Sequence, residues 1–255
     1  MALRNKTGLG MMECKEALGA NGGDPAKAEE WLRAKKKGKM DARTERTTGE
    51  GRIGIAIGSG CAAIVEVRTE TDFTARNDAF IKMVDDVASA AVKQASDGEV
   101  SLTPEMTKRI DDVRITTGEN ANFSRGCRLS GGSFGRYVHF DGKRAALVQV
   151  EGSAPEDLLK GVCQHIVFHD PLGIDEKDVS ADQLTTIRSE AIEEAKASGK
   201  PAGIAEKIAE GKVRKYLEER TLLHQHYILD ETKTVKEILP KGVSIRRFIR
   251  YTLGG

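Results

Sequence analysis

The sequence predicts an α+β protein: a small N-terminal helical domain, then two related α+β subdomains with antiparallel sheets, and an antiparallel helical hairpin inserted into the second of them. Two stretches with a strand–turn–strand–helix pattern follow each other, at 53–93 and 136–168. Helical periodicity dominates residues 11–32 before them and 180–226 after them. At 255 residues, of which 39% are hydrophobic and 31% charged, the chain is long enough for two or three compact units.

The first 40 residues are expected to form a small helical domain. An amphipathic stretch covers residues 11–18, and a turn at 21–23 separates it from a second helix. That helix begins favourably because Asp24 can cap it and Pro25 fits its first position. Short helices are stable only when they pack together, so we predict a three-helix unit at 1–38, with its first helix cut short by the start of the chain.

A basic segment follows the helical domain. Residues 33–51 are rich in Lys and Arg, hold little apolar material and are expected to be a linker, with the linker between domains placed at 39–51. One interpretation is a nucleic-acid-binding patch, and the other is a solvated tether that docks on an acidic partner. No aromatic residues are interspersed for base stacking, which favours the tether.

Two hairpin-and-helix units make up the predicted core. The first has strands at 53–57 and 62–67 around a Gly-Ser-Gly turn, followed by helices at 78–93 and 103–115. We place this subdomain at 52–134.

The second unit repeats the pattern rather than the residues. Its strands at 136–140 and 145–150 flank an Asp-Gly turn, which is a strong hairpin signal, and a helix at 155–168 follows. Residues 244–253 alternate between apolar and basic side chains and are predicted as a last strand that returns to this sheet. The second subdomain therefore comprises residues 135–179 and 227–255.

The insertion at 180–226 is predicted to be helical. A capping-box pattern begins at Ser180, and the helix after it runs to residue 197. A break at 198–201 precedes a second helix that runs to residue 224. Two long helices around a short break are typical of an antiparallel helical hairpin, and their polar faces would let it project from the body.

Charge and composition exclude several protein classes. Forty basic side chains oppose 39 acidic ones, so the net charge is +1, whereas a protein that mainly binds phosphate backbones carries a large positive excess. There is no run of about 18 apolar residues and no signal peptide, so a cytoplasmic protein is expected. The four cysteines include no Cys-x-x-Cys pair and are expected to be free, mostly buried thiols.

No catalytic residue, metal site or cofactor site is predicted. A phosphate-binding P-loop needs a Lys after its glycines, and the Gly-Ser-Gly at 58–60 lacks one. His165 and His169 lie four apart on a predicted helix, but no acidic third ligand accompanies them, so structural or surface histidines are favoured over a metal pair. The His-Gln-His at 224–226 is no stronger a candidate for a metal site.

The connection at 71–77 carries the strongest functional signal. It joins a predicted strand to a predicted helix and contains an acidic, an aromatic and a basic residue, Asp72, Phe73 and Arg76, with Asn77 as a helix cap. Taken alone, it indicates a loop whose Phe73 packs into its own core.

Residues 70–77, Glu-Thr-Asp-Phe-Thr-Ala-Arg-Asn, closely resemble a signature of the elongation factor Ts family. Residues 3–18 resemble that family's other signature, and the segments at 117–120, 198–208 and 247–250 are similar too. The resemblance spans nearly the whole chain in the right order.

This resemblance implies an exchange factor that replaces GDP by GTP on elongation factor Tu, in the bacterial cytoplasm or an organelle matrix, with no catalysis, cofactor or nucleotide binding of its own. It implies a ubiquitin-associated-like N-terminal domain and a hairpin often used for homodimerisation. In the family an Asp-Phe pair enters the GTPase domain beside its magnesium and phosphate site. The partner-binding residues implied here are Asp72, Phe73, Arg76, Asn77, Gly118, His165, Met11, Met12 and Lys15.

Three other classes compete with this interpretation. A nucleic-acid-binding protein would use the basic segment at 33–46 and the arginines near the chain end. An adaptor would bind a peptide or ubiquitin-like partner through its N-terminal helices. A metalloenzyme would use His165 and His169.

Overall fold

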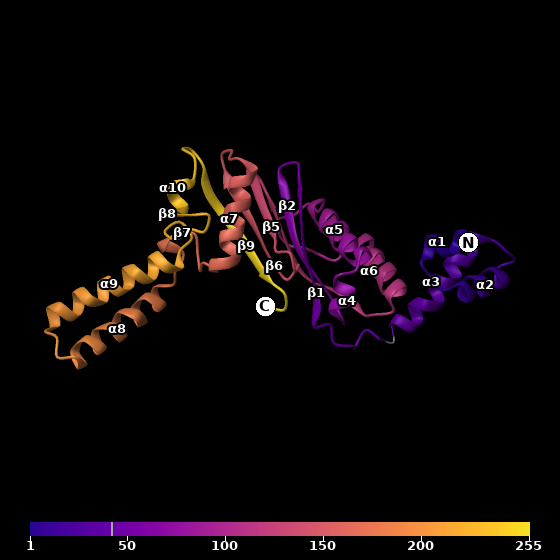
Figure 1. The fold of residues 1–255 in the computed structure, drawn as a ribbon, viewed down its shortest axis with the longest axis horizontal. Coiled ribbons are helices and arrows are strands. Elements are labelled where there is room, and N and C mark those ends of the chain that lie inside the picture. Colours follow the sequence, from indigo (N-terminus) through magenta and orange to yellow (C-terminus); the bar gives the residue numbers. More distant parts are fainter. Residues whose placement is uncertain (42) are drawn as a thin grey trace. The chain divides into compact units, whose positions relative to one another are not determined.

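The computed structural model describes residues 1–41 and 43–255, with only the backbone described at 39 and 40. The chain divides into two compact units, whose elements are labelled in Figure 1. Within the described residues, no helix combines the length and apolar character that crossing a membrane requires. Unit 1 comprises Met1–Ser130, Phe140–Arg144 and Tyr251–Gly255, and unit 2 comprises Gly131–His139 and Ala145–Arg250.

The N-terminal domain has the three predicted helices, α1 (Ala2–Thr7), α2 (Met11–Ala20) and α3 (Pro25–Asp41). Asp24 caps α3 as expected, because its Oδ1 accepts hydrogen bonds from two backbone N–H groups of the first turn. The apolar side chains that meet between the helices are Leu3, Leu9, Ala17, Ala28 and Leu32.

The linker prediction is wrong for residues 33–41, which continue α3. Lys and Arg are good helix formers, and four of the basic side chains described in this run have acidic partners. Lys35 and Lys36 pair with Glu16 and Glu13 of α2 at 2.5 and 3.1 Å. Arg33 pairs with Asp112, and Lys37 pairs with Asp111.

Unit 1 is built on a four-stranded antiparallel sheet in the order β1-β2-β4-β3. The predicted hairpin is β1 (Glu50–Gly58) with β2 (Cys61–Thr69), and the predicted helices are α5 (Asp78–Val92) and α6 (Pro104–Thr117). The helices pack on the sheet through a core that includes Phe80, Val84 and Met106. The sequence did not predict β3 (Gly98–Glu99) or β4 (Ala121–Ser130).

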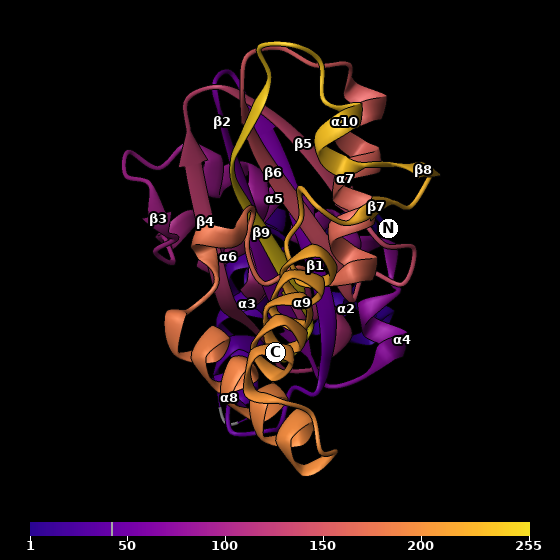
Figure 2. The same cartoon turned by 90° about the vertical axis from the view of Figure 1, so that its left-hand side faces the viewer.

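Unit 2 has a three-stranded sheet in the order β5-β6-β9, with α7 (Glu156–His169) against β5 (Figure 2). The strands are β5 (Ser133–Val138), β6 (Arg144–Glu151) and β9 (Ser244–Thr252), so the predicted return of the chain end to this sheet is confirmed. The smaller elements, which were not predicted, are β7 (His226–Tyr227), β8 (Asp230–Thr234), α10 (Val235–Ile238) and a 3-10 turn at Glu176–Asp178.

A pair of glycines supports the predicted kinship of the two sheet subdomains. Gly54 of β1 lies opposite Val65 and faces α5, where an added Cβ would stand 2.7 Å from Val84 Cγ1. Gly135 of β5 lies opposite Val148, and an added Cβ would overlap Leu159 of α7. In each subdomain, therefore, the first strand of the hairpin has a glycine where a side chain would overlap the covering helix.

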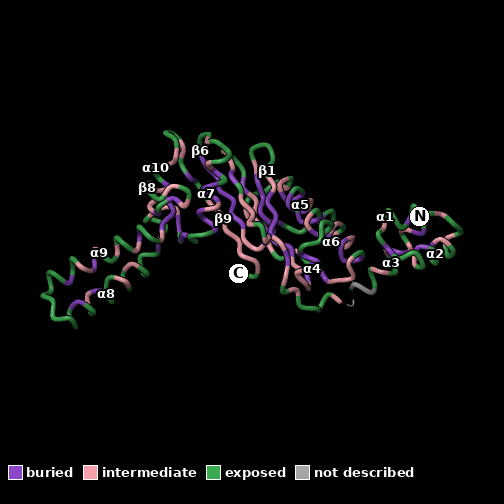
Figure 3. The backbone as a smooth tube through the Cα atoms, viewed as in Figure 1, coloured by how far each residue is buried: buried purple, intermediate pink, exposed green. Residues whose placement is uncertain are grey.

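The predicted helical hairpin consists of α8 (Ala181–Ala197) and α9 (Ala202–Arg220). Small buried side chains let the helices approach each other, while Figure 3 shows their outer faces exposed. Ser180 forms no side-chain cap, so the capping-box prediction is wrong. α9 ends four residues earlier than expected because the next residues leave the helix: Leu222 N donates to Gly173 O at 2.9 Å. The small buried residues are Ala191, Ala195, Ala205 and Ala209.

All four cysteines are free thiols, as expected. Cys14 and Cys163 are buried, whereas Cys61 and Cys127 are partly exposed, so only half of them fit the expected burial.

Candidate partner-binding site

The segment between β2 and α5 is a short turn fixed by two helix caps. Residues Asp72–Ala75 form the single-turn helix α4, and Thr71 caps it because its Oγ1 accepts from Thr74 N at 3.3 Å. Asn77 then caps α5, its Oδ1 accepting from a first-turn N–H at 2.8 Å, which confirms its predicted capping role. Two caps within seven residues leave this connection little conformational freedom.

Phe73 is presented to solvent at the tip of this turn. Its side chain is 84% exposed, while the following Thr74 and Ala75 are buried and anchor the turn. The interpretation in which this ring packs into its own core is therefore wrong. Asp72 and the highly exposed Arg76 form an ion pair at 3.2 Å on the same turn. Large exposed apolar groups rimmed by charge are typical of interaction sites.

A carboxylate from a distant part of the sequence holds the base of the turn. Glu119 Oε2 accepts from Thr71 N at 3.1 Å and from Thr69 Oγ1 at 3.2 Å, and its Oε1 accepts from Thr71 Oγ1 at 2.7 Å. Burial alone would raise the pKa of Glu119, but hydrogen bonds from Thr71, Thr74 and Thr69 outweigh it and lower the pKa. The carboxylate is therefore charged at neutral pH and fixes the β2–α4 junction.

The segment around Gly118 ties the same region to the chain after α3. Gly118 ends α6 in the left-handed conformation at φ +75°, and its carbonyl accepts from Arg43 Nη1 at 2.8 Å. Asn120 is buried, and its Nδ2 donates to the carbonyls of Thr44 and Arg46, each at 3.0 Å. Sequence reasoning assigned no role to Glu119 or Asn120; the similarity at 117–120 was the signal that could have found them.

Met11, Met12 and Lys15 lie exposed on α2, with Met11 59% and Met12 76% exposed. The buried side of the same helix holds Cys14 and Ala17. Two exposed methionines beside a lysine make an adaptable apolar surface, and this patch lies on a different element from the Phe73 turn.

His165, expected to contact a partner, is instead a core residue of unit 2. Its side chain is fully buried, and both ring nitrogens are hydrogen-bonded. Ile228 N donates to Nδ1 at 3.2 Å, so Nε2 carries the proton and donates to Gln225 Oε1 at 2.9 Å. The Gln225 amide is oriented in turn, because its Nε2 donates to Glu219 O. The expectation of a direct partner contact through His165 is wrong because the ring has no exposed surface.

Burial lowers the pKa of His165 to about 4. The hydrogen bond with Gln225 opposes this shift only in part, and the nearby His169 adds a smaller lowering. His169, which is exposed, stacks on His165 with ring centroids 4.3 Å apart. Since both nitrogens of His165 are engaged, the pair cannot serve as metal ligands in this arrangement. Among the residues described, no cluster of three or more possible metal ligands occurs.

The model of the family described as elongation factor TS matches residues 70–255, which begin with the junction that carries Phe73. An elongation factor Ts of Methylococcus capsulatus is 42% identical over 99% of this chain and 89% of its own length. The chain belongs to the elongation factor Ts family. Elongation factor Ts proteins of Pediococcus pentosaceus and of an Azoarcus species are each 38% identical over 99% of this chain, covering 89% and 88% of their own lengths. This member of the elongation factor Ts family is accordingly a translation elongation factor.

Proposed function

We propose that the protein promotes exchange of GDP for GTP on elongation factor Tu, in the bacterial cytoplasm, by binding the GTPase domain and disrupting its magnesium and phosphate site. The observation that carries this proposal is the 84% exposed Phe73 on a doubly capped turn held by Glu119. Family membership supports the choice of partner.

The proposed mechanism uses a preformed wedge against a geometrically demanding metal site. A GTPase holds its nucleotide largely through magnesium and phosphate contacts, and magnesium requires near-ideal octahedral geometry. Inserting Phe73 between partner side chains displaces the groups that hold the metal. Burying one Phe contributes about 1.5–3 kcal/mol, which corresponds to roughly a ten- to hundredfold change in affinity. The turn is already ordered, so little of this gain is lost to fixing its conformation.

Other contacts must supply the rest of the binding energy. We assign part of it to Met11, Met12 and Lys15 on the exposed side of α2, and part to Asp72 and Arg76 around the ring. Asn77 and Gly118 are further proposed partner contacts: Asn77 caps the first turn of α5, and the Gly118 carbonyl accepts from Arg43 Nη1.

Release follows from thermodynamic reciprocity. If this protein weakens nucleotide binding by some factor, nucleotide weakens its binding by the same factor. Incoming GTP then displaces it, and no bond is made or broken by this chain.

The test is stopped-flow release of a fluorescent GDP from elongation factor Tu. Phe73→Ala is expected to slow the stimulated release at least about tenfold, by loss of the wedge. Phe140→Ala is the matched control, since Phe140 is 86% exposed and belongs to the turn between β5 and β6. An unchanged stimulated rate in Phe73→Ala, or equal losses in both variants, would remove the wedge role.

The basic segment after residue 33 favours this proposal over nucleic-acid binding. Four of its cations, Arg33, Lys35, Lys36 and Lys37, form ion pairs within the protein. Cations that are already paired release fewer counterions on contact with phosphates. Binding to RNA with a steep dependence on salt, in the absence of any GTPase, would reverse this preference.

We further propose homodimerisation through α8 and α9. Leu184, Val213 and Leu217 line a groove along the hairpin, and Ile204 is 49% exposed. Sedimentation equilibrium of the full chain should show a dimer that Val213→Glu dissociates. A monomer at all concentrations would refute this part of the proposal.

A further inference from the structure

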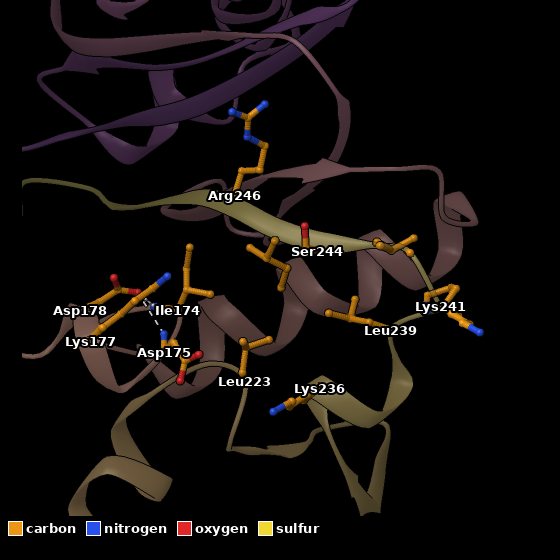
Figure 4. Close-up of a pocket in the computed structure, with 14 residues that line it drawn as sticks. Ile174, Asp175, Lys177, Asp178, Leu223, Lys236, Leu239, Lys241, Ser244 and Arg246 are labelled. Carbon is orange, nitrogen blue, oxygen red and sulfur yellow. Dashed lines mark hydrogen bonds between the residues drawn. The ribbon is translucent and has the colours of Figure 1, made fainter.

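Unit 2 contains an open pocket of about 630 Å³ next to the first residues of β9. Figure 4 shows its lining side chains, which come from the 3-10 turn after α7, the segment after α9, α10 with the turn that follows it, and β9. The floor is apolar and is the outer layer of the unit 2 core. Its members are Ile174, Leu223, Leu239, Val243 and Ile245.

Three lysines surround this apolar floor. Lys177, Lys236 and Lys241 line the pocket and are all exposed, whereas the side chain of Arg246 points away from the floor on the opposite side of β9 (Figure 4). Across the described part of the chain, none of the three lysines has an ion-pair partner within 4.0 Å. The rim therefore keeps its positive charge available.

The two carboxylates at the pocket are committed to the local fold. Asp178 Oδ2 accepts from the backbone N–H groups of Ile174 and Asp175, at 2.8 and 3.0 Å. Asp175 Oδ1 accepts from Glu176 N at 2.8 Å. Both acids thus satisfy backbone donors of the turn, and they offset the charge of the three lysines only in part.

The pocket also lies at a sheet edge. In the order β5-β6-β9, β9 is a terminal strand, and its residues Ser244, Ile245 and Arg246 line the pocket. Edge strands can accept a further extended chain by main-chain hydrogen bonds, while alternate side chains of that chain enter neighbouring pockets.

We propose that this pocket binds an extended acidic segment of a protein partner. Apolar side chains of the segment occupy the floor, its carboxylates meet the three lysines, and its backbone lies along the edge of β9. An isolated anion would use the cations but leave the apolar floor unoccupied, which is why a peptide fits better. The inference concerns unit 2 alone and does not depend on the proposed function of Phe73.

The test uses the full chain and a fluorescein-labelled ten-residue peptide in which Glu alternates with Val or Leu, followed by fluorescence anisotropy. Two control peptides replace either every Glu by Gln or every apolar residue by Ser. Both controls are expected to bind at least about tenfold more weakly, because each removes one of the two recognised features. Failure of the acidic–apolar peptide to bind, or equal binding of either control, overturns the proposal.

A charge-matched pair of variants tests the location of the site. Lys177→Glu/Lys241→Glu is expected to weaken peptide binding at least about tenfold. Lys160→Glu/Lys207→Glu makes the same change in net charge at exposed positions of unit 2 outside the pocket, and at about 0.15 M salt it should alter binding by less than about twofold. Equal losses in the two variants would mean non-specific attraction and would overturn the assignment.

Two further readouts distinguish the occupant. In ¹⁵N NMR spectra the peptide should shift the backbone amide signals of residues 242–246, and shifts confined to other residues would contradict the site. Displacement of the peptide by inorganic phosphate at equal concentration would reveal a simple anion site instead. A dimer that Lys177→Glu/Lys241→Glu dissociates, seen by sedimentation, would show that a second copy fills the pocket and would likewise overturn the proposal.

Discussion

Burial of His165 predicts that unit 2 loses stability as the pH falls from about 6.5 to about 4. Its pKa is lowered from 6.5 to about 4, first because the ring is removed from water. The hydrogen bonds agree with this direction, because Nδ1 accepts from Ile228 N. A proton added at Nδ1 would break this hydrogen bond and leave two buried N–H groups, those of His165 and Ile228, facing each other. The folded state thus holds this imidazole neutral.

The sign and size follow from proton linkage. Above pH 6.5 neither the folded nor the unfolded chain binds a proton at this residue, and its contribution to stability is fully present. Between pH 6.5 and about 4 the unfolded chain binds a proton and the folded chain does not, so the free energy of unfolding decreases. At roughly 1.4 kcal/mol per pKa unit, the full loss is about 3 kcal/mol. Below the folded pKa both states are protonated and the dependence ends.

Two measurements check this prediction. A ¹H NMR titration of the His165 ring should give a pKa near 4. Urea unfolding, followed by the methyl signals of Ile166 in unit 2, should show a decrease in the free energy of unfolding between pH 7 and pH 4 that is about 3 kcal/mol larger in the unmodified protein than in His165→Gln. Gln is neutral throughout, so the comparison removes the contributions of other titrating groups.

Titration of His165 near 6.5, or equal pH dependence in the two proteins, would show that the ring is hydrated and the reasoning wrong.

The other predictions concern the supports of the fold and of the Phe73 turn. Glu119→Gln should lower the free energy of unfolding of unit 1 by about 1–2 kcal/mol, because the three hydrogen bonds that Glu119 accepts from Thr69 and Thr71 lose their charge. It should also slow stimulated nucleotide release with Phe73 still in place. Urea unfolding measures the first effect, and stopped-flow release measures the second. Gly135→Ala should lower the free energy of unfolding by about 1–3 kcal/mol, because the added methyl group overlaps Leu159. Gly211→Ala, in open space within α9, should raise it by roughly 0.5–1 kcal/mol. Thermal melts that rank the two variants the other way would contradict the close approach of α7. Glu66→Gln should lower the free energy of unfolding by about 3 kcal/mol, because this buried carboxylate accepts from Arg125 Nε at 2.8 Å and from Gly254 N at 3.1 Å. A melting temperature within error of the unmodified protein would mean that the charged pair of Glu66 and Arg125 is replaceable.

Much of the fold could be predicted because the local signals agreed with the tertiary arrangement. The Asp-Gly turn and alternating apolar residues predicted the β5–β6 hairpin, and Asp24-Pro25 predicted the start of α3. Strand β4 escaped prediction because Asn122, Ser124 and Arg125 interrupt its apolar residues. Its place in the sheet comes from pairing with β2 and β3 rather than from its own propensity.

Part of the site could be predicted in the same way. Asn77 was predicted as a cap from its position before an apolar helix, and this proved right. No local sequence pattern indicated the role of Glu119, because its carboxylate accepts a hydrogen bond from the backbone N–H of Thr71, 48 positions earlier in the chain. A hydrogen bond over that separation depends on β2 and β4 lying side by side.

By itself, the sequence determined the family, the two hairpin-and-helix subdomains and the helical hairpin, since these depend on short-range periodicity, turn residues and a recognisable order of motifs. Only the tertiary structure decided which side chains face water. Phe73 and His165 both lie on helices, yet the first is 84% exposed and the second fully buried. The physical reason is that periodicity shows which residues share a face, whereas exposure depends on what covers that face. Gln225 and Ile228 hydrogen-bond to the buried ring of His165, while buried Thr74 and Ala75 anchor the turn that holds Phe73 in solvent.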